Sequence, residues 1–320
     1  MRWLTDVRLV VAIGGNALLE RGEKPDASVQ LGHIRSAAAA LAPLARDHEV
    51  VLCHGNGPQV GLLALESDAD ETLSHPYPLD VLGAQTQGMI GYWLSQSLHN
   101  AGVTKQIANI TTQTVVDAAD ASFADPSKPI GPVYTEARAR ALSREHGWTV
   151  AADTASWRRV VPSPRPIRLI EQTTIDVLIE SGCVVICGGG GGAPVVEEAS
   201  GRLRGVEAVV DKDLTATVLA EAIRADHLLV LTDVPAVVDR FGTAHSSPLD
   251  RVYTDELHLK NFAVGSMGPK VRACIDFVRA TGRSASIGAL TDAEGVLAGR
   301  SGTTILDRPS EDLEMGRRRA

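Results

Sequence analysis

Short apolar runs alternate with segments of helical periodicity along most of this 320-residue chain. The runs that we predict to be strands are residues 8–13, 49–53, 105–110, 183–187, 227–232, 284–290 and 302–306. The segments that we predict to be helices include residues 31–45, 80–100, 171–181, 213–224 and 268–281. Strands buried on both faces are continuously apolar, which is typical of parallel sheets joined by helices. The pattern therefore predicts an α/β fold in which helices cover both faces of a largely parallel sheet.

One segment interrupts this alternation. Residues 120–166 are rich in Pro, Arg and Ser, and only residues 135–146 have helical periodicity. We interpret residues 120–166 as a small subdomain inserted into a single domain of residues 1–320. It protrudes from the main sheet and is a candidate lid.

The bulk properties exclude several classes of protein. A net charge of -8 argues against a nucleic-acid binder. The first apolar run is too short for a signal peptide or a membrane span. The four cysteines form no C-x-x-C pair, and no His, Cys and carboxylate cluster has the spacing of a structural zinc site. We therefore expect a cytoplasmic enzyme that binds neither nucleic acid nor a membrane.

Five consecutive glycines, residues 188–192, follow the apolar run 183–187. Their spacing matches a dinucleotide-binding fingerprint, but that motif needs a helix directly afterwards. Here Pro194 is followed by residues 195–210, whose pattern predicts two short strands around the Ser200-Gly201 turn. No Lys-Ser or Lys-Thr follows the glycines, which excludes a P-loop. We predict that this segment forms a wall of a site and is not its main phosphate cradle.

Glycine-rich turns also close the first two predicted strands. They contain Gly14, Gly15 and Asn16 after the first strand, and Gly55, Asn56 and Gly57 after the second. Glycine allows backbone N–H groups to approach an anion closely, and ligands of parallel sheets lie beyond the carboxyl ends of the strands. Two such turns at adjacent strand ends predict a phosphate cradle. His54 is either a ligand contact or a packed strand-end histidine.

Three lysines are candidates for charge neutralisation. Lys270 lies in the first turn of a predicted helix, with Pro269 expected at the first helical position, and a cation there opposes the helix dipole. Lys212 lies at another helix start, where Asp211 and Asp213 could cap the helix while Lys212 points to water. Lys128 lies in a proline-rich loop, where an exposed lysine is the simplest interpretation. A cation at the start of a helix, as at Lys270, suggests that an anion, such as a transferring phosphoryl group, completes the site.

The motifs AIGGNALL, HGNGPQVG, QGMIGYWL, PSKPIGPVY, RRVVPSPRPI, GGGGGAPVV, VDKDLTA, LTDV and GSMGPKV occur in this order. Together they resemble the carbamate kinases of the amino-acid kinase superfamily. The resemblance implies a three-layer αβα sandwich around a largely parallel eight-stranded sheet, a small protruding subdomain and a homodimer. It also implies the reaction ATP + carbamate ⇌ ADP + carbamoyl phosphate with Mg²⁺ held mainly by the nucleotide phosphates, and physiological ATP synthesis in arginine or related catabolism.

The resemblance assigns roles to individual residues. Lys128, Lys212 and Lys270 would contact the phosphoryl group and substrate, and Asp213 would orient lysines. The residues implied to line the phosphoryl and carbamate pocket are Gly14, Gly15, Asn16, Gly55, Asn56 and Gly57. Those implied to border the nucleotide, within a half of about residues 205–310, are Thr232, Asp233, Val234, Ser266 and Met267. Two departures from the family pattern stand at Gly268 and at residues 153–157.

Other functions remain open at this point. One alternative is a superfamily kinase that acts on N-acetylglutamate, glutamate, aspartate or a nucleoside monophosphate. Another is a non-catalytic protein that binds carbamoyl phosphate or a nucleotide. The proline-rich insertion favours carbamate, and retention of all three lysines favours catalysis over mere binding.

Overall fold

A computed structural model describes residues 7–15, 18–20, 22–153, 156–258, 260, 262 and 267–308. Within them, the main sheet has eight strands in the order β15-β17-β16-β12-β1-β2-β9-β3. The strands are β1 (Arg8–Ile13), β2 (Glu49–His54), β3 (Ile107–Asn109), β9 (Val184–Ile186), β12 (His227–Thr232), β15 (Arg251–Tyr253), β16 (Ser284–Ala289) and β17 (Thr303–Leu306). The six strands from β16 to β3 are mutually parallel, while β17 pairs with β16 in the antiparallel sense. The predicted largely parallel sheet is confirmed.

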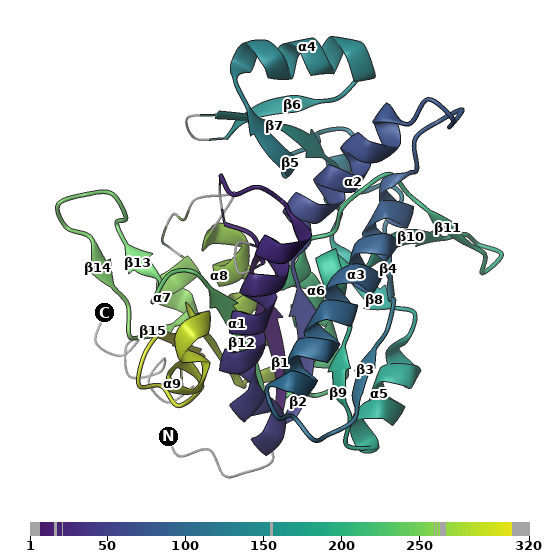
Figure 1. Ribbon diagram of the computed structural model, residues 1–320. Coiled ribbons are helices and arrows are strands. Elements are labelled where there is room, and N and C mark those ends of the chain that lie inside the picture. Colours follow the sequence, from purple (N-terminus) through teal and green to yellow (C-terminus); the bar gives the residue numbers. More distant parts are fainter. Residues whose placement is uncertain are drawn as a thin grey trace.

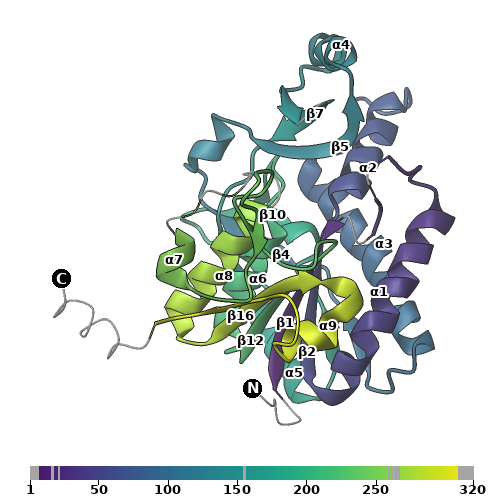
Figure 2. The same ribbon diagram turned by 90° about the vertical axis from the view of Figure 1, so that its left-hand side faces the viewer.

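Helices cover both faces of this sheet, and Figure 2 shows the layers edge-on. One layer contains α1 (Ala27–Asp47), α3 (Leu79–Asn100) and α9 (Ala293–Leu297), and the other contains α5 (Gln172–Glu180), α6 (Lys212–Ala222), α7 (Thr254–His258) and α8 (Met267–Thr281). In β1, Leu9 and Val11 pack in the first core, whereas Val10 and Ala12 pack in the second. Because both sets of side chains are buried, the strand is apolar at every one of these positions. The three-layer αβα prediction is confirmed.

Two smaller sheets flank the main one. The first has the order β11-β10-β4-β8 and contains β4 (Gln113–Val116), β8 (Pro166–Leu169), β10 (Ala193–Glu197) and β11 (Leu203–Gly205). The hairpin predicted around Ser200-Gly201 is the antiparallel pair β10–β11. A short pair of strands, β13 (Val238–Asp239) and β14 (Ser247–Pro248), was not predicted from the sequence. No helix among the described residues is long and apolar enough to cross a membrane.

A small subdomain stands above the carboxyl edge of the main sheet (Figure 1). It consists of the sheet β5-β7-β6 and one helix, namely β5 (Lys128–Tyr134), α4 (Glu136–His146), β6 (Val150–Asp153) and β7 (Ser156–Val161). The predicted helix at residues 135–146 corresponds to α4. The side chain of Thr135 caps α4, and Gly147 in the left-handed region ends it.

The subdomain packs on α2 (Gly57–Ala69) through two glycines. A Cβ added to Gly61 of α2 would lie 1.9 Å from the Cα of Gly131 in β5. Gly131 itself has φ +69°, which disfavours any side chain there. The backbones of α2 and β5 therefore approach too closely for any residue but glycine at position 61.

We predict that Gly61→Ala lowers the free energy of unfolding by about 1–3 kcal/mol, because the new methyl group overlaps the β5 backbone. Urea denaturation measures the change. The matched control is Gly32→Ala in α1, where an added Cβ meets nothing within 4 Å. That substitution should be neutral or stabilising by up to about 1 kcal/mol, since alanine favours the helix. Equal effects of the two substitutions would contradict the close-contact explanation.

Candidate active site

The two glycine turns meet at the carboxyl edge of the main sheet. The N–H of Gly14 donates to the Leu231 carbonyl of β12, and the N–H of Gly55 donates to the Ile13 carbonyl, both at 3.0 Å. A Cβ on Gly55 would lie 2.7 Å from the Gly15 nitrogen. The turns predicted to lie side by side are therefore in backbone contact.

The second turn leads directly into α2. Asn56 is the residue that precedes the helix, Gly57 is its first residue, and Pro58 follows in the first turn. The Asn56 side chain is buried and donates to Thr86 Oγ1 of α3 at 2.8 Å. Asn16, the corresponding residue of the first turn, lies outside the described residues.

The five-glycine segment is a close-packed wall beside these turns. Gly188, Gly190, Gly191 and Gly192 have positive φ, and residues 188–192 are all buried. A Cβ on Gly189 would lie 2.3 Å from His54 Nε2, and one on Gly190 would lie 2.1 Å from Asn56 Nδ2. The glycines are thus explained by backbone conformation and by lack of space, in agreement with the predicted wall.

His54 ends β2 as a buried, packed residue. Its Nδ1 lies 3.0 Å from the Gly55 carbonyl oxygen, and its Nε2 is buried without a hydrogen-bond partner among the described atoms. Burial, with a smaller contribution from the Lys212 charge, lowers the pKa of His54 from 6.5 to about 4. The imidazole is therefore neutral near pH 7, and its Nδ1–H donates to Gly55. Of the two interpretations, the structure supports the packed histidine.

Three lysines from three different elements converge above the turns. We call Lys128, Asp211, Lys212, Asp213 and Lys270 the charged cluster. The Nζ of Lys212 lies 2.8 Å from Asp213 Oδ1, and that of Lys270 lies 3.3 Å from Asp213 Oδ2. The Nζ of Lys128 lies 2.7 Å from Asp211 Oδ2. The buried carboxylate of Asp213 thus holds the lysines of α6 and α8, and the partly buried carboxylate of Asp211 holds the lysine of β5.

The structure decides three points about these lysines that the sequence left open. Lys212 does not point to water, since its side chain is only 11% exposed. Pro269 is the third residue of α8 and not the first, and the charge of Lys270 is offset by Asp213 of α6. Lys128 is not a freely exposed lysine, because it forms an ion pair with Asp211. The partners of the three lysines are Asp213, in the first turn of α6, and Asp211, which caps that helix.

The charged cluster carries an excess of positive charge. Three lysines and two aspartates leave it one net positive charge when all five are ionised. The nearby Lys212 charge, together with burial, lowers the pKa of Lys270. Burial opposes the charge on Lys212, but Asp213 and Asp211 raise its pKa overall. An incoming anion would relieve the repulsion between these ammonium groups.

Asp211 caps α6, as the sequence suggested. Its Oδ1 accepts from the Asp213 N–H at 2.9 Å, which caps α6. Its other oxygen binds Lys128, which lies 83 residues earlier in the chain. No local pattern in the sequence indicates that second contact.

The predicted nucleotide-binding residues lie at the same edge of the sheet. Thr232 ends β12, and its Cα lies 3.9 Å from the position of a Cβ added to Gly14. Thr232 Oγ1 donates to Asp233 Oδ1 at 2.9 Å, and Val234 is partly exposed beyond them. Met267 begins α8, whereas Ser266 lies outside the described residues.

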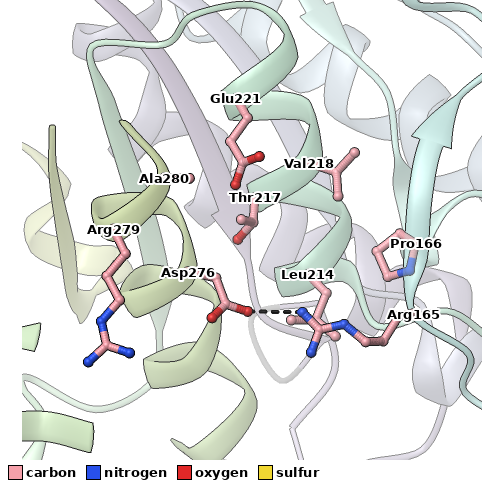
Figure 3. Close-up of a pocket in the computed structure, with 9 residues that line it drawn as sticks. All are labelled: Arg165, Pro166, Leu214, Thr217, Val218, Glu221, Asp276, Arg279 and Ala280. Atoms are coloured by element: carbon pink, nitrogen blue, oxygen red, sulfur yellow. Dashed lines mark hydrogen bonds and ion pairs between the residues drawn. The ribbon is translucent and has the colours of Figure 1, made fainter. Parts of the chain in front are cut away.

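A hollow lies away from the charged cluster, between α6, α8 and the start of β8 (Figure 3). Its volume is about 480 Å³, and an ion pair between Arg165 and Asp276 at 3.1 Å lies at its margin. No member of the charged cluster lines it. Within the described part of the chain, no group of three His, Cys, Asp or Glu residues could hold a metal ion.

The fold and the site define a phosphotransferase: the chain belongs to the amino acid kinase family, whose family model matches residues 7–289. Within that family it is similar to carbamate kinases. The carbamate kinase of Rhizobium meliloti is 47% identical over 302 residues, which cover 93% of each chain. That of Escherichia coli K12 is 47% identical over 93% of this chain and 98% of its own.

Solved structures agree with these relatives. Carbamate kinase from Giardia lamblia bound to AMP-PNP is 38% identical, with a TM-score of 0.85 over 95% of this chain and 99% of its own. The same enzyme bound to citric acid has a TM-score of 0.88 over the same shares of the two chains. The fold expected from the sequence resemblance, including the small subdomain, is therefore confirmed.

We predict that acid weakens the fold through two buried histidines. Burial lowers the pKa of His54 from 6.5 to about 4 and that of His227 from 6.5 to about 3. Each neutral histidine therefore stabilises the fold above pH 6.5, and this contribution is lost as the pH falls toward the folded-state pKa. Between pH 6.5 and pH 5 the expected loss is about 1–2 kcal/mol for each histidine.

Urea titrations at pH 6.5 and pH 5 measure this loss. The variant His54→Gln cannot take up the proton at that position, so it should lose only about half as much stability between the two pH values. An unchanged loss in this variant would show that His54 is not the titrating group.

Proposed function

We propose that this chain is a carbamate kinase that catalyses ATP + carbamate ⇌ ADP + carbamoyl phosphate. The observation that carries the proposal is the charged cluster, in which a lysine of the inserted subdomain joins two lysines at helix starts. Identities of 45–48% to carbamate kinases over 93% of the chain support it. We assign the physiological direction to ATP synthesis from carbamoyl phosphate in arginine or related catabolism.

The chemistry matches these side chains. Phosphoryl transfer depends on positioning and charge neutralisation more than on covalent chemistry. Carbamate is already an anion, so its oxygen attacks without a general base. We assign charge neutralisation of the transferring group to Lys212 and Lys270, and their orientation to the shared carboxylate of Asp213.

Backbone N–H groups of the glycine turns complete the proposed phosphoryl pocket. Gly14 and Gly55 shape the turns, but their own N–H groups are already bonded within the sheet. We therefore assign the contacts with phosphoryl oxygens to the residues that follow, Gly15, Asn56 and Gly57, together with Asn16. The start of α2 adds unpaired N–H groups and the positive end of the helix dipole.

We place the nucleotide beside Thr232, Asp233, Val234, Ser266 and Met267, within the half formed by about residues 205–310. The carboxylates of the charged cluster, Asp211 and Asp213, are paired with lysines, which leaves Mg²⁺ to be held mainly by the nucleotide phosphates. Bound there, Mg²⁺ would neutralise phosphate charge. This assignment of the ion follows from the existing ion pairs of the two aspartates.

The inserted subdomain, about residues 120–166, is the proposed lid. It carries Lys128 to the cluster and rests on α2 at the Gly61–Gly131 contact. A lid over so small a substrate would exclude water and add specificity. We propose in addition that the protein is a cytoplasmic homodimer.

The alternatives lack comparable support. N-acetylglutamate synthase from Neisseria gonorrhoeae, with bound coenzyme A and N-acetyl-glutamate, has a TM-score of 0.56 at 15% identity, a likeness of fold alone. A non-catalytic binding protein would not need three lysines held by two carboxylates. Catalysis on carbamate remains the best-supported function.

We predict that the purified protein forms ATP from ADP, Mg²⁺ and carbamoyl phosphate. A coupled ATP assay measures the product, with acetyl phosphate, N-acetylglutamyl phosphate and a reaction of UMP with ATP run in parallel. Carbamoyl phosphate should give the highest kcat/KM. A higher value for another substrate would identify a different kinase, and binding of carbamoyl phosphate without turnover would identify a non-catalytic protein.

We predict that Lys212→Ala and Lys270→Ala each lower kcat by roughly 10²-fold or more, because each removes a charge that stabilises the transition state. The matched control is Lys105→Ala. Lys105 Nζ also forms a hydrogen bond, which it donates to the His48 carbonyl oxygen at 2.7 Å, but Lys105 lies at the amino edge of the sheet. This control should keep wild-type kcat, and near-normal turnover of both cluster variants would refute their assigned roles.

A further inference from the structure

The two carboxylate oxygens of Asp211 have different partners. Oδ1 caps α6 by accepting from the Asp213 N–H, whereas Oδ2 binds the Lys128 ammonium. We propose that Asp211 is a positioning residue that holds Lys128 of the inserted subdomain in the site for carbamoyl phosphate. This inference rests on the proposed function and adds a residue to it.

Electrostatics explain why Lys128 needs such a partner. Lys212 and Lys270 share the single negative charge of Asp213. Asp213 therefore has no further charge to offset that of Lys128. Without Asp211, a third ammonium group would have to approach two others in a largely buried site. Like charges repel strongly where water screening is weak. Asp211 offsets this repulsion where the subdomain meets α6.

Asp211 connects the start of α6 with the inserted subdomain. It directly precedes α6, so its carboxylate is fixed relative to Lys212 and Asp213 by the helix start. Lys128 is the first residue of β5, which forms the edge of the small sheet next to α2. Burial opposes ionisation of Asp211, but the charges of Lys128 and Lys212 lower its pKa, so it remains an anion at neutral pH.

The substitution Asp211→Asn separates the two roles. Asparagine is as good a helix cap as aspartate, and its amide oxygen can still accept from the Asp213 N–H. It lacks the negative charge that holds Lys128. A capping role alone therefore predicts no effect of this substitution, whereas a positioning role predicts weaker substrate binding.

The experiment compares the KM for carbamoyl phosphate and kcat in Asp211→Asn, Lys128→Ala and the double variant. We expect a rise in KM of about tenfold or more in each single variant, the scale of a lost hydrogen bond to a charged group, with a smaller change in kcat. The double variant should resemble Lys128→Ala, because the two residues act through one contact. Asp211→Glu, which restores the charge, should recover part of the wild-type KM.

Asp226→Asn is the matched control. Like Asp211, Asp226 has one oxygen that accepts from a backbone N–H, here that of Arg8, and one that binds a cation, here Arg283. Asp226 lies at the opposite edge of the sheet, so Asp226→Asn should leave KM unchanged. A wild-type KM in Asp211→Asn, or effects of Asp211→Asn and Lys128→Ala that multiply in the double variant, would overturn the inference. Loss of the proposed function itself would show separately, as absence of turnover in the wild-type protein.

Discussion

The Asp213 carboxylate, almost fully buried at the start of α6, is the interaction on which the site depends. Its two oxygens bind Lys212 and Lys270, so it joins the starts of α6 and α8 above the edge of the main sheet. Removing one partner of a buried ion pair leaves an uncompensated charge, which is strongly unfavourable. The lysines are consequently held in place before any substrate arrives, which is what transfer of a charged phosphoryl group requires.

Glycines, which have no side chain, are as important for the geometry of this site as the charged residues are. Gly55 allows the turn after β2 to touch the turn after β1, and Gly189 and Gly190 leave room for His54 and Asn56. The contact between Gly61 and Gly131 brings β5, and with it Lys128, down onto α2. A methyl group at Gly55, Gly61, Gly189 or Gly190 would overlap a neighbouring residue, because these closely packed segments have no free volume to accommodate it.

The sequence predicted most of the regular structure, and many of the residues predicted to form the site lie together at the carboxyl edge of the sheet. The residues of β1 and β12, and the order of strands and helices, follow from continuous apolar runs and helical periodicity. The glycine turns were recognised because two of them end neighbouring strands. The edge strand β15 was missed because three residues carry too little periodicity, and the short strands β13 and β14 for the same reason. The pairing of Lys128 with Asp211 was missed because the residues next to Asp211 in the sequence indicate only that it caps a helix.

By itself, the sequence determined which segments become strands or helices, where the chain turns at the carboxyl edge of the sheet, and which family the chain resembles. These properties depend on neighbouring residues, which are close in the chain. Only the tertiary structure decided which charges pair. Asp213 binds a lysine 57 residues away, and Asp211 binds one 83 residues away. Such pairs depend on how α6, α8 and the inserted subdomain are placed relative to one another, and that placement results from packing of the whole core.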